Sequence, residues 1–198
     1  MRIGLDLDGT ILDSRPRHKL ALEEACERLS VELPAGLSEN YVSEKSDGYT
    51  GLDVLRKYNV RQAEQVSAYW MGIIENPSML SQDKLYPDVK LILDKLYMGN
   101  VLYLVTARRY NDRVLDQIHK ASIGTCFKDI IIVSNDNYKN VGVRKGMATQ
   151  SYNLSLVIGD TESDCEWADY VGAEFRPVTS GFRSEAYWAA RNIKAYSR

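Results

Sequence analysis

Short apolar runs recur along the chain, and most lack the polar alternation of a half-exposed strand. They are RIGLDL at 2–7, VLYLV at 101–105, IIIV at 130–133, LSLVIG at 154–159 and AEF at 173–175. Continuous apolar runs of this length are typical of parallel strands, which are buried because helices cover both faces of the sheet. We therefore predict a short first strand and further buried parallel strands after it.

Helical spacing of apolar residues separates the later strands. Two segments have apolar side chains at i, i+3 and i+4 or close to it: Val89, Ile92, Leu93 and Leu96, then Val114, Leu115 and Ile118. Strand and helix thus alternate from Tyr86 onward, which predicts an α/β fold with a doubly wound, Rossmann-like parallel sheet. Ligands of such sheets bind beyond the carboxyl ends of the strands, where the strand order reverses.

The stretch at 16–83 interrupts this alternation after the first strand. It contains helical patterns, such as KLALEEACERL and VRQAEQVSAYWMGII, and no convincing strand. We predict a core formed by 1–15 and 84–198, with 16–83 as an inserted α-helical cap that folds over the active site.

Composition narrows the class of protein. The chain has 198 residues, 44% hydrophobic and 26% charged, with a net charge of -2, which fits one globular core carrying a small insertion. Clustered basic residues, which a nucleic acid partner requires, are not in excess. No apolar run approaches the roughly 20 residues of a membrane span, and the start MRIGLDLDGT is acidic, so we expect a cytoplasmic protein.

The cysteines and histidines suggest no chemistry. Cys26, Cys126 and Cys165 are widely spaced without a CxxC pair, so we expect buried, reduced thiols. His18 and His119 lie near no serine or cysteine arrangement of a catalytic triad and are expected to be surface or structural residues.

Four segments place chemically useful residues at or near the ends of predicted strands. They are DLDGT with Asp6 and Asp8, VTAR with Thr106, the basic stretch with Lys145, and GDTESD with Asp160 and Asp164. Each segment alone has a plain structural explanation: DG favours a turn, Thr106 suits a helix N-cap, and the acids of GDTESD suit a helix start. Their coincidence at separate strand ends favours a common site.

In the order and type of these motifs the chain resembles the haloacid dehalogenase superfamily, most of whose members are phosphatases and phosphomutases. The resemblance covers the core, and the insertion lies where members similar to phosphoglycolate phosphatase and β-phosphoglucomutase carry a helical cap. It implies that Asp6 is the nucleophile, that Asp8 is the general acid and base, and that Thr106 and Lys145 bind the transferred phosphoryl group.

The chemistry explains these residue types. A carboxylate nucleophile divides a very slow ester hydrolysis into two easier steps through an aspartyl-phosphate. Two carboxylates about 4 Å apart repel by about 4 kcal/mol at an effective dielectric of about 20, so a cation is needed. We expect Mg²⁺, held by Asp6, Asp160, Asp164 and a main-chain oxygen of Asp8. Asp8 should be a carboxyl kept partly protonated by its surroundings.

The remaining assignments concern the substrate. We expect Thr10, Arg108, Lys45 and Tyr49 to bind it, the last two because the loop at about 44–51 reaches the active site in similar capped enzymes. Arg15 and Arg17 near the cap junction are expected to be solvated charges. Lys139 and Arg144 lie close to Lys145 and remain alternatives to it as the phosphate-binding residue.

The sequence thus predicts a Mg²⁺-dependent phosphatase acting on a small phosphorylated metabolite, as a monomer or a homodimer. A phosphomutase has the same core residues and stays an alternative, as does a non-catalytic phosphate-binding protein of the same fold. A dehalogenase is not favoured, because that reaction has no leaving alcohol for Asp8 to protonate.

Overall fold

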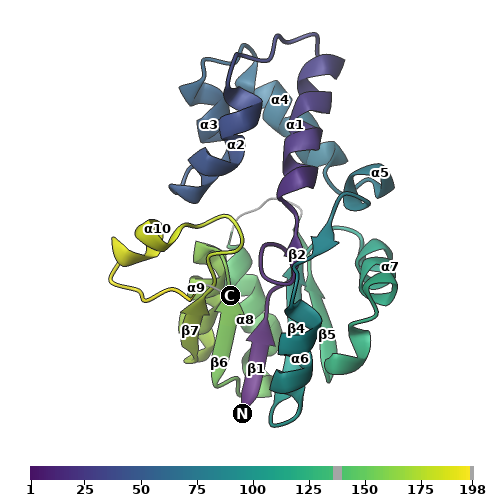
Figure 1. Ribbon diagram of the computed structural model, residues 1–198, viewed down its shortest axis with the longest axis vertical. Helices are drawn as coiled ribbons and strands as arrows, with labels where there is room; N and C mark the ends of the chain where they lie inside the picture. Colours follow the sequence, from purple (N-terminus) through teal and green to yellow (C-terminus); the bar gives the residue numbers. More distant parts are fainter. Residues whose placement is uncertain (136–139, 197–198) are drawn as a thin grey trace.

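A computed structural model of the protein describes residues 1–135 and 140–196 (Figure 1). The strands are β1 (Arg2–Leu5), β2 (Leu12–Asp13), β3 (Lys84–Leu85), β4 (Val101–Ala107), β5 (Asp129–Val133), β6 (Leu156–Gly159) and β7 (Glu174–Pro177). The α-helices are α1 (Arg15–Arg28), α2 (Leu37–Ser46), α3 (Gly51–Lys57), α4 (Ala63–Ile73), α5 (Pro77–Leu80), α6 (Val89–Tyr97), α7 (Asn111–Ala121), α8 (Val141–Thr149), α9 (Glu162–Val171) and α10 (Glu185–Ala189). Two 3₁₀ turns, Gly124–Cys126 and Gln150–Tyr152, complete the set.

The main sheet has five strands in the order β5-β4-β1-β6-β7, and every pairing is parallel. The predicted α/β doubly wound fold is therefore confirmed. The strand order reverses at β1, which pairs with β4 on one side and β6 on the other. β1 is shorter than predicted because the amides of Ile11 and Leu12 donate to the Leu7 carbonyl and turn the chain.

Alternate residues of each strand enter different cores, one on each face of the sheet. Leu102 and Leu104 pack with α6 and α7, while Tyr103 and Val105 pack with α9. Gly4 lies where β1 meets Trp167 of α9; a Cβ there would lie 2.5 Å from the indole. The missing side chain thus allows α9 to pack close to the central strand.

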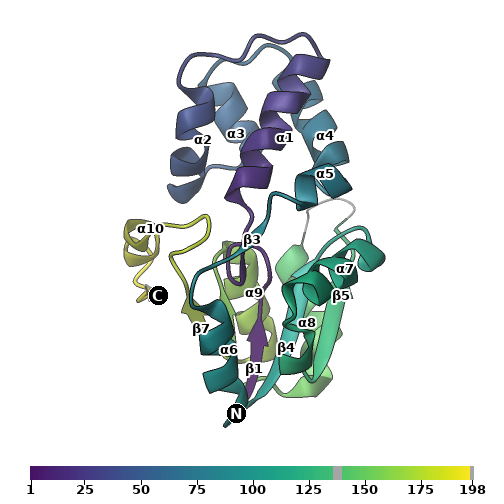
Figure 2. The same cartoon turned by 45° about the vertical axis from the view of Figure 1, so that its right-hand side comes forward.

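Helices α1 to α5 form a separate layer above the sheet, and we call this layer the cap (Figures 1 and 2). It has a hydrophobic cluster of its own, centred on Leu22, Tyr41 and Val66. The chain enters the cap through β2 and leaves it through β3, and these two strands pair antiparallel, with Leu12 opposite Leu85. The sequence did not predict this small hairpin, because its strands have two residues each.

The segment after β7 returns from the sheet toward the cap and leads into α10, which lies beneath α2 (Figure 1). The Ser184 amide donates to the Ser46 carbonyl in the last turn of α2 across 3.1 Å, and Arg183 donates to the Lys45 carbonyl. Carbonyls in the last turn of a helix have no amide partner within it; that of Lys45 also accepts from the Gly48 amide at 3.1 Å. The core therefore contacts the cap here as well as at the hairpin.

Among the described helices, none combines the length and apolar character needed to cross a bilayer. The three cysteines are free; Cys26 is buried, and Cys126 and Cys165 are half-buried.

Candidate active site

The carboxyl ends of β1, β4 and β6 bring three buried polar side chains together: Asp6, Thr106 and Asp160. All three line a cleft of about 560 Å³ between the sheet and the cap. Lys45 and Trp70 line it from the cap side. The cleft therefore occupies the place where a doubly wound sheet binds its ligands.

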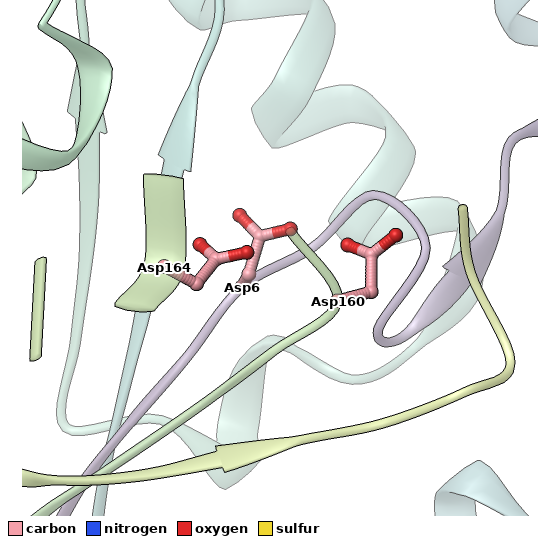
Figure 3. Close-up of side chains that lie close together, drawn as sticks. All are labelled: Asp6, Asp160 and Asp164. Carbon is pink, nitrogen blue, oxygen red and sulfur yellow. The ribbon is translucent and has the colours of Figure 1, made fainter. Parts of the chain in front are cut away.

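Three carboxylates form a cluster here, and two of them, Asp6 and Asp160, line the cleft. Asp6 follows β1, Asp160 follows β6, and Asp164 lies in the first turn of α9; each offers an oxygen within 4.8 Å of the others. Figure 3 shows the three side chains side by side, rising from these separate segments. All three are buried, so their negative charges are poorly screened by water.

Among the described residues, Lys145 of α8 supplies the cation that contacts this cluster. Its ammonium lies 2.5 Å from Asp6 Oδ1 and 2.7 Å from Asp164 Oδ1, and donates a hydrogen bond to each. Burial lowers the pKa of Lys145, but Asp164 and Asp6 outweigh it and the pKa is raised. Lys145 is thus a firmly charged lysine, while the alternative Lys139 lies outside the described residues.

The cluster fits a divalent cation. Asp160 Oδ1 is buried and has no hydrogen-bond partner among the described residues, while its Oδ2 accepts from the Phe182 amide at 2.7 Å. Burial, and then the charges of Asp164 and Asp6, raise the pKa of Asp160 well above its usual value. One ammonium cannot neutralise three carboxylates, and an oxygen-rich set of this kind suits Mg²⁺.

Asp164 differs from the other two acids because both of its oxygens have protein partners. Oδ1 accepts from Lys145, and Oδ2 accepts from the Thr161 amide at 3.1 Å and from its hydroxyl at 2.9 Å. Thr161 and Asp164 form a capping box that starts α9. Asp164 as a metal ligand stays a prediction, and so does the main-chain oxygen of Asp8.

Asp8 does not have the environment expected for it. Arg108 forms a two-pronged ion pair with its carboxylate at 2.7 Å, and Arg17 adds a contact of 2.6 Å. Burial raises the pKa of Asp8, but Arg108 and Arg17 outweigh it and hold the pKa well below its usual range. The structure therefore shows a carboxylate, whereas the sequence analysis expected a partly protonated carboxyl.

Of the other residues predicted to bind the substrate, three line the cleft and one does not. Arg108, Lys45 and Tyr49 line the cleft. Thr10 is buried, its hydroxyl has no partner among the described residues, and it is not one of the residues that line the cleft. Lys45 belongs to the last turn of α2, so this helix extends to Ser46 and covers the first residues of the predicted loop at 44–51.

Several residues that line the cleft were not predicted to belong to the site. Arg17 was expected to be solvated, yet its side chain is 3% exposed and contacts Asp8 and Asp83. His18 is half-buried and contacts the rings of Trp70 and Phe182; removal from water, then Lys45, lower its pKa well below the usual value. Both residues lie in the first turn of α1, shortly after the DLDGT motif. This closeness in sequence to Asp8 could have indicated that they lie near the site.

Phe182, Arg183 and Glu162 also line the cleft and were not predicted. Arg183 Nε lies 2.7 Å from Glu162 Oε1, which the Tyr187 hydroxyl also contacts. Glu162 stands inside the GDTESD motif, but no pattern in the sequence marks the loop that carries Phe182 and Arg183.

The sequence model of the haloacid dehalogenase-like hydrolase family matches residues 3–178. The chain belongs to this family. No curated protein matches the sequence. Solved structures with the same fold include a haloacid dehalogenase-like family protein from Streptococcus pneumoniae, with a TM-score of 0.76 and 20% identity, covering 100% of this chain and 93% of that one.

Two further structures show how this hydrolase fold recurs. A predicted phosphatase from Clostridium acetobutylicum has a TM-score of 0.74 and 18% identity, covering 100% of this chain and 93% of that one. A predicted phosphoglycolate phosphatase from Haemophilus somnus 129PT has a TM-score of 0.65 and 23% identity, covering 91% and 86%. At these identities the likeness concerns the haloacid dehalogenase-like fold.

Proposed function

We propose that this hydrolase is a Mg²⁺-dependent phosphatase that cleaves a small phosphorylated metabolite through an aspartyl-phosphate on Asp6. The observation that carries the proposal is the unpartnered Oδ1 of Asp160 beside Asp6 and Lys145. Family membership and the phosphatase names of structures with this fold support the same reaction class.

Asp6 and Asp160 would hold Mg²⁺, with Asp164 and the Asp8 carbonyl as further predicted ligands. The bound ion supplies positive charge that lets an anionic ester approach an anionic nucleophile. Lys145 supports the same approach, since its ammonium is fixed 2.5 Å from Asp6 Oδ1. Thr106, buried at the end of β4, offers its hydroxyl to a phosphoryl oxygen.

The proposed reaction has two steps. An oxygen of Asp6 bonds to phosphorus as the bond to the ester oxygen breaks, and the departing oxygen takes a proton from Asp8. Water then bonds to the same phosphorus, Asp8 takes a proton from it, and Asp6 is released with inorganic phosphate. Asp8 as observed is ready for the second step; the first requires its ion pairs with Arg17 and Arg108 to loosen so that it can carry a proton.

Phosphate release from a panel of sugar phosphates, nucleotides and phosphoglycolate, with and without Mg²⁺, tests the proposal. Turnover should require Mg²⁺ and vanish in Asp6→Asn. Asp116→Asn is a matched control, since Asp116 is an exposed carboxylate on α7 that pairs with Lys120. No release from any ester at saturating Mg²⁺ would contradict the phosphatase, and isomerisation of a sugar phosphate faster than its hydrolysis would favour the mutase.

A further inference from the structure

Five side-chain cations of the described residues line the cleft, and described carboxylates engage four of them. These pairs are Lys145 with Asp6 and Asp164, Arg17 and Arg108 with Asp8, and Arg183 with Glu162. Lys45 is the fifth, and no described carboxylate lies within the 4.0 Å of an ion pair from its ammonium. Glu162, an acid in its vicinity, is already bound by Arg183 and Tyr187.

Aromatic rings surround the Lys45 ammonium instead. Its Nζ lies 4.5 Å from the ring centroid of Phe182, 5.7 Å from that of Tyr41 and 5.9 Å from that of Trp70. Ring faces attract a cation but supply no strong hydrogen-bond acceptor, so they replace little of the hydration that burial removes. Burial, and then the neighbouring Arg183, lower the pKa of Lys45 to about 8.

The core fixes the position of this cation relative to the metal site. Phe182, whose ring lies nearest to the ammonium, donates its amide to Asp160 Oδ2 at 2.7 Å. Arg183 donates to the Lys45 carbonyl, and the Ser184 amide donates to the Ser46 carbonyl at 3.1 Å. The same short loop therefore contacts Asp160, a proposed metal ligand, on one side and the Lys45 backbone on the other, which preorganises Lys45 toward a ligand.

We propose that Lys45 binds a second anionic group of the substrate, so that the substrate class is small metabolites with a phosphate ester at one end and a carboxylate or further phosphate at the other. The proposal rests on the proposed function for the phosphate end. A neutral sugar or alcohol would leave the ammonium without a counter-charge, whereas an anion would supply both charge and hydrogen-bond acceptors.

Calorimetric binding to the full chain with Mg²⁺ tests this without requiring turnover. The probes are 3-phosphonopropionate, with a carboxylate, propane-1,3-bisphosphonate, with a second phosphonate, and propylphosphonate, with no second anion. At least one of the two probes with a second anionic group should bind about tenfold or more tightly than propylphosphonate, the gain of one charge-assisted hydrogen bond. The stronger of the two identifies the second anion.

In Lys45→Met this preference should collapse, and in Lys45→Arg part of it should remain. Lys57→Met is the matched control, because Lys57 is a cap lysine already paired with Glu44, and it should keep the full preference. Equal binding of all three probes to the wild type, or an undiminished preference in Lys45→Met, would overturn the proposal. If phosphate release requires Mg²⁺ but is equally fast for substrates with and without a second anion, the phosphatase proposal holds and the Lys45 proposal is wrong.

Discussion

The ammonium of Lys145 lies 2.5 Å from Oδ1 of Asp6, the proposed nucleophile. Lys145→Ala should lower kcat/KM by about 10²-fold or more, the usual loss when a donor that stabilises transition-state charge is removed. Lys139→Ala should keep turnover. Rates of phosphate release for the two variants check this, and a reversed pattern would assign the role to Lys139.

Mg²⁺ should stabilise the folded protein. At about ten times its Kd the ion should add about 1.4 kcal/mol to the free energy of unfolding, which raises Tm by a few degrees. Asp160→Asn should abolish this shift, because it removes the unpartnered Oδ1 as a charged ligand. The same variant should be more stable than the wild type without metal, since one of three clustered carboxylates is gone. A metal-dependent shift that survives in Asp160→Asn would place the ion elsewhere.

The buried ion pairs of Asp8 should matter more for stability than exposed ones. Arg17→Met removes a cation that contacts Asp8 at 2.6 Å and Asp83 at 3.3 Å. It should lower the free energy of unfolding by about 2–4 kcal/mol, because Arg108 is then the one described cation that pairs with Asp8 and Asp83. Arg15→Met, which breaks a more exposed pair with Asp13, should cost at most about 1 kcal/mol. Equal losses in denaturant titrations would contradict this ranking.

Lys45 should reduce the stability of the protein without ligand. Its pKa is about 8 in the folded chain against a usual 10.5, so the penalty is complete below pH 8 and is relieved as pH rises toward 10.5. Lys45→Met should therefore be more stable than the wild type by about 1 kcal/mol at pH 7, after the loss of its ring contacts. The difference should shrink between pH 8 and 10.5. Denaturation midpoints across this range measure it, and a constant difference would contradict the buried charge.

The sequence predicted the sheet and the residues at its carboxyl edge because both are marked by short, local sequence patterns. Apolar runs marked all five strands, and Asp6, Thr106 and Asp160 stood directly at or beyond strand ends. Parallel strands end at one edge of a sheet, so residues at those ends converge without any further information. Lys145 could be preferred to Lys139 and Arg144 because it lies in the helical run that precedes the LSLVIG strand.

The sequence did not predict which arginines pair with which carboxylates. Asp8 is ionised because Arg17 reaches it from the first turn of the cap and Arg108 from the end of β4, and nothing local to DLDGT contains that pairing. The loop with Phe182 and Arg183 was missed for the same reason. Its role depends on contacts with α2, whose residues lie far away in the chain.

The cap is joined to the core by two strands that lie against each other, with Asp13 opposite Lys84. A segment whose ends are neighbours can be removed or replaced without reordering the sheet, so this hairpin is a natural junction for exchanging one cap for another. The exchange has one condition. A transplanted cap would also have to present carbonyls to Arg183 and Ser184, as the end of α2 does here. The two contact regions together restrict which caps this core can carry.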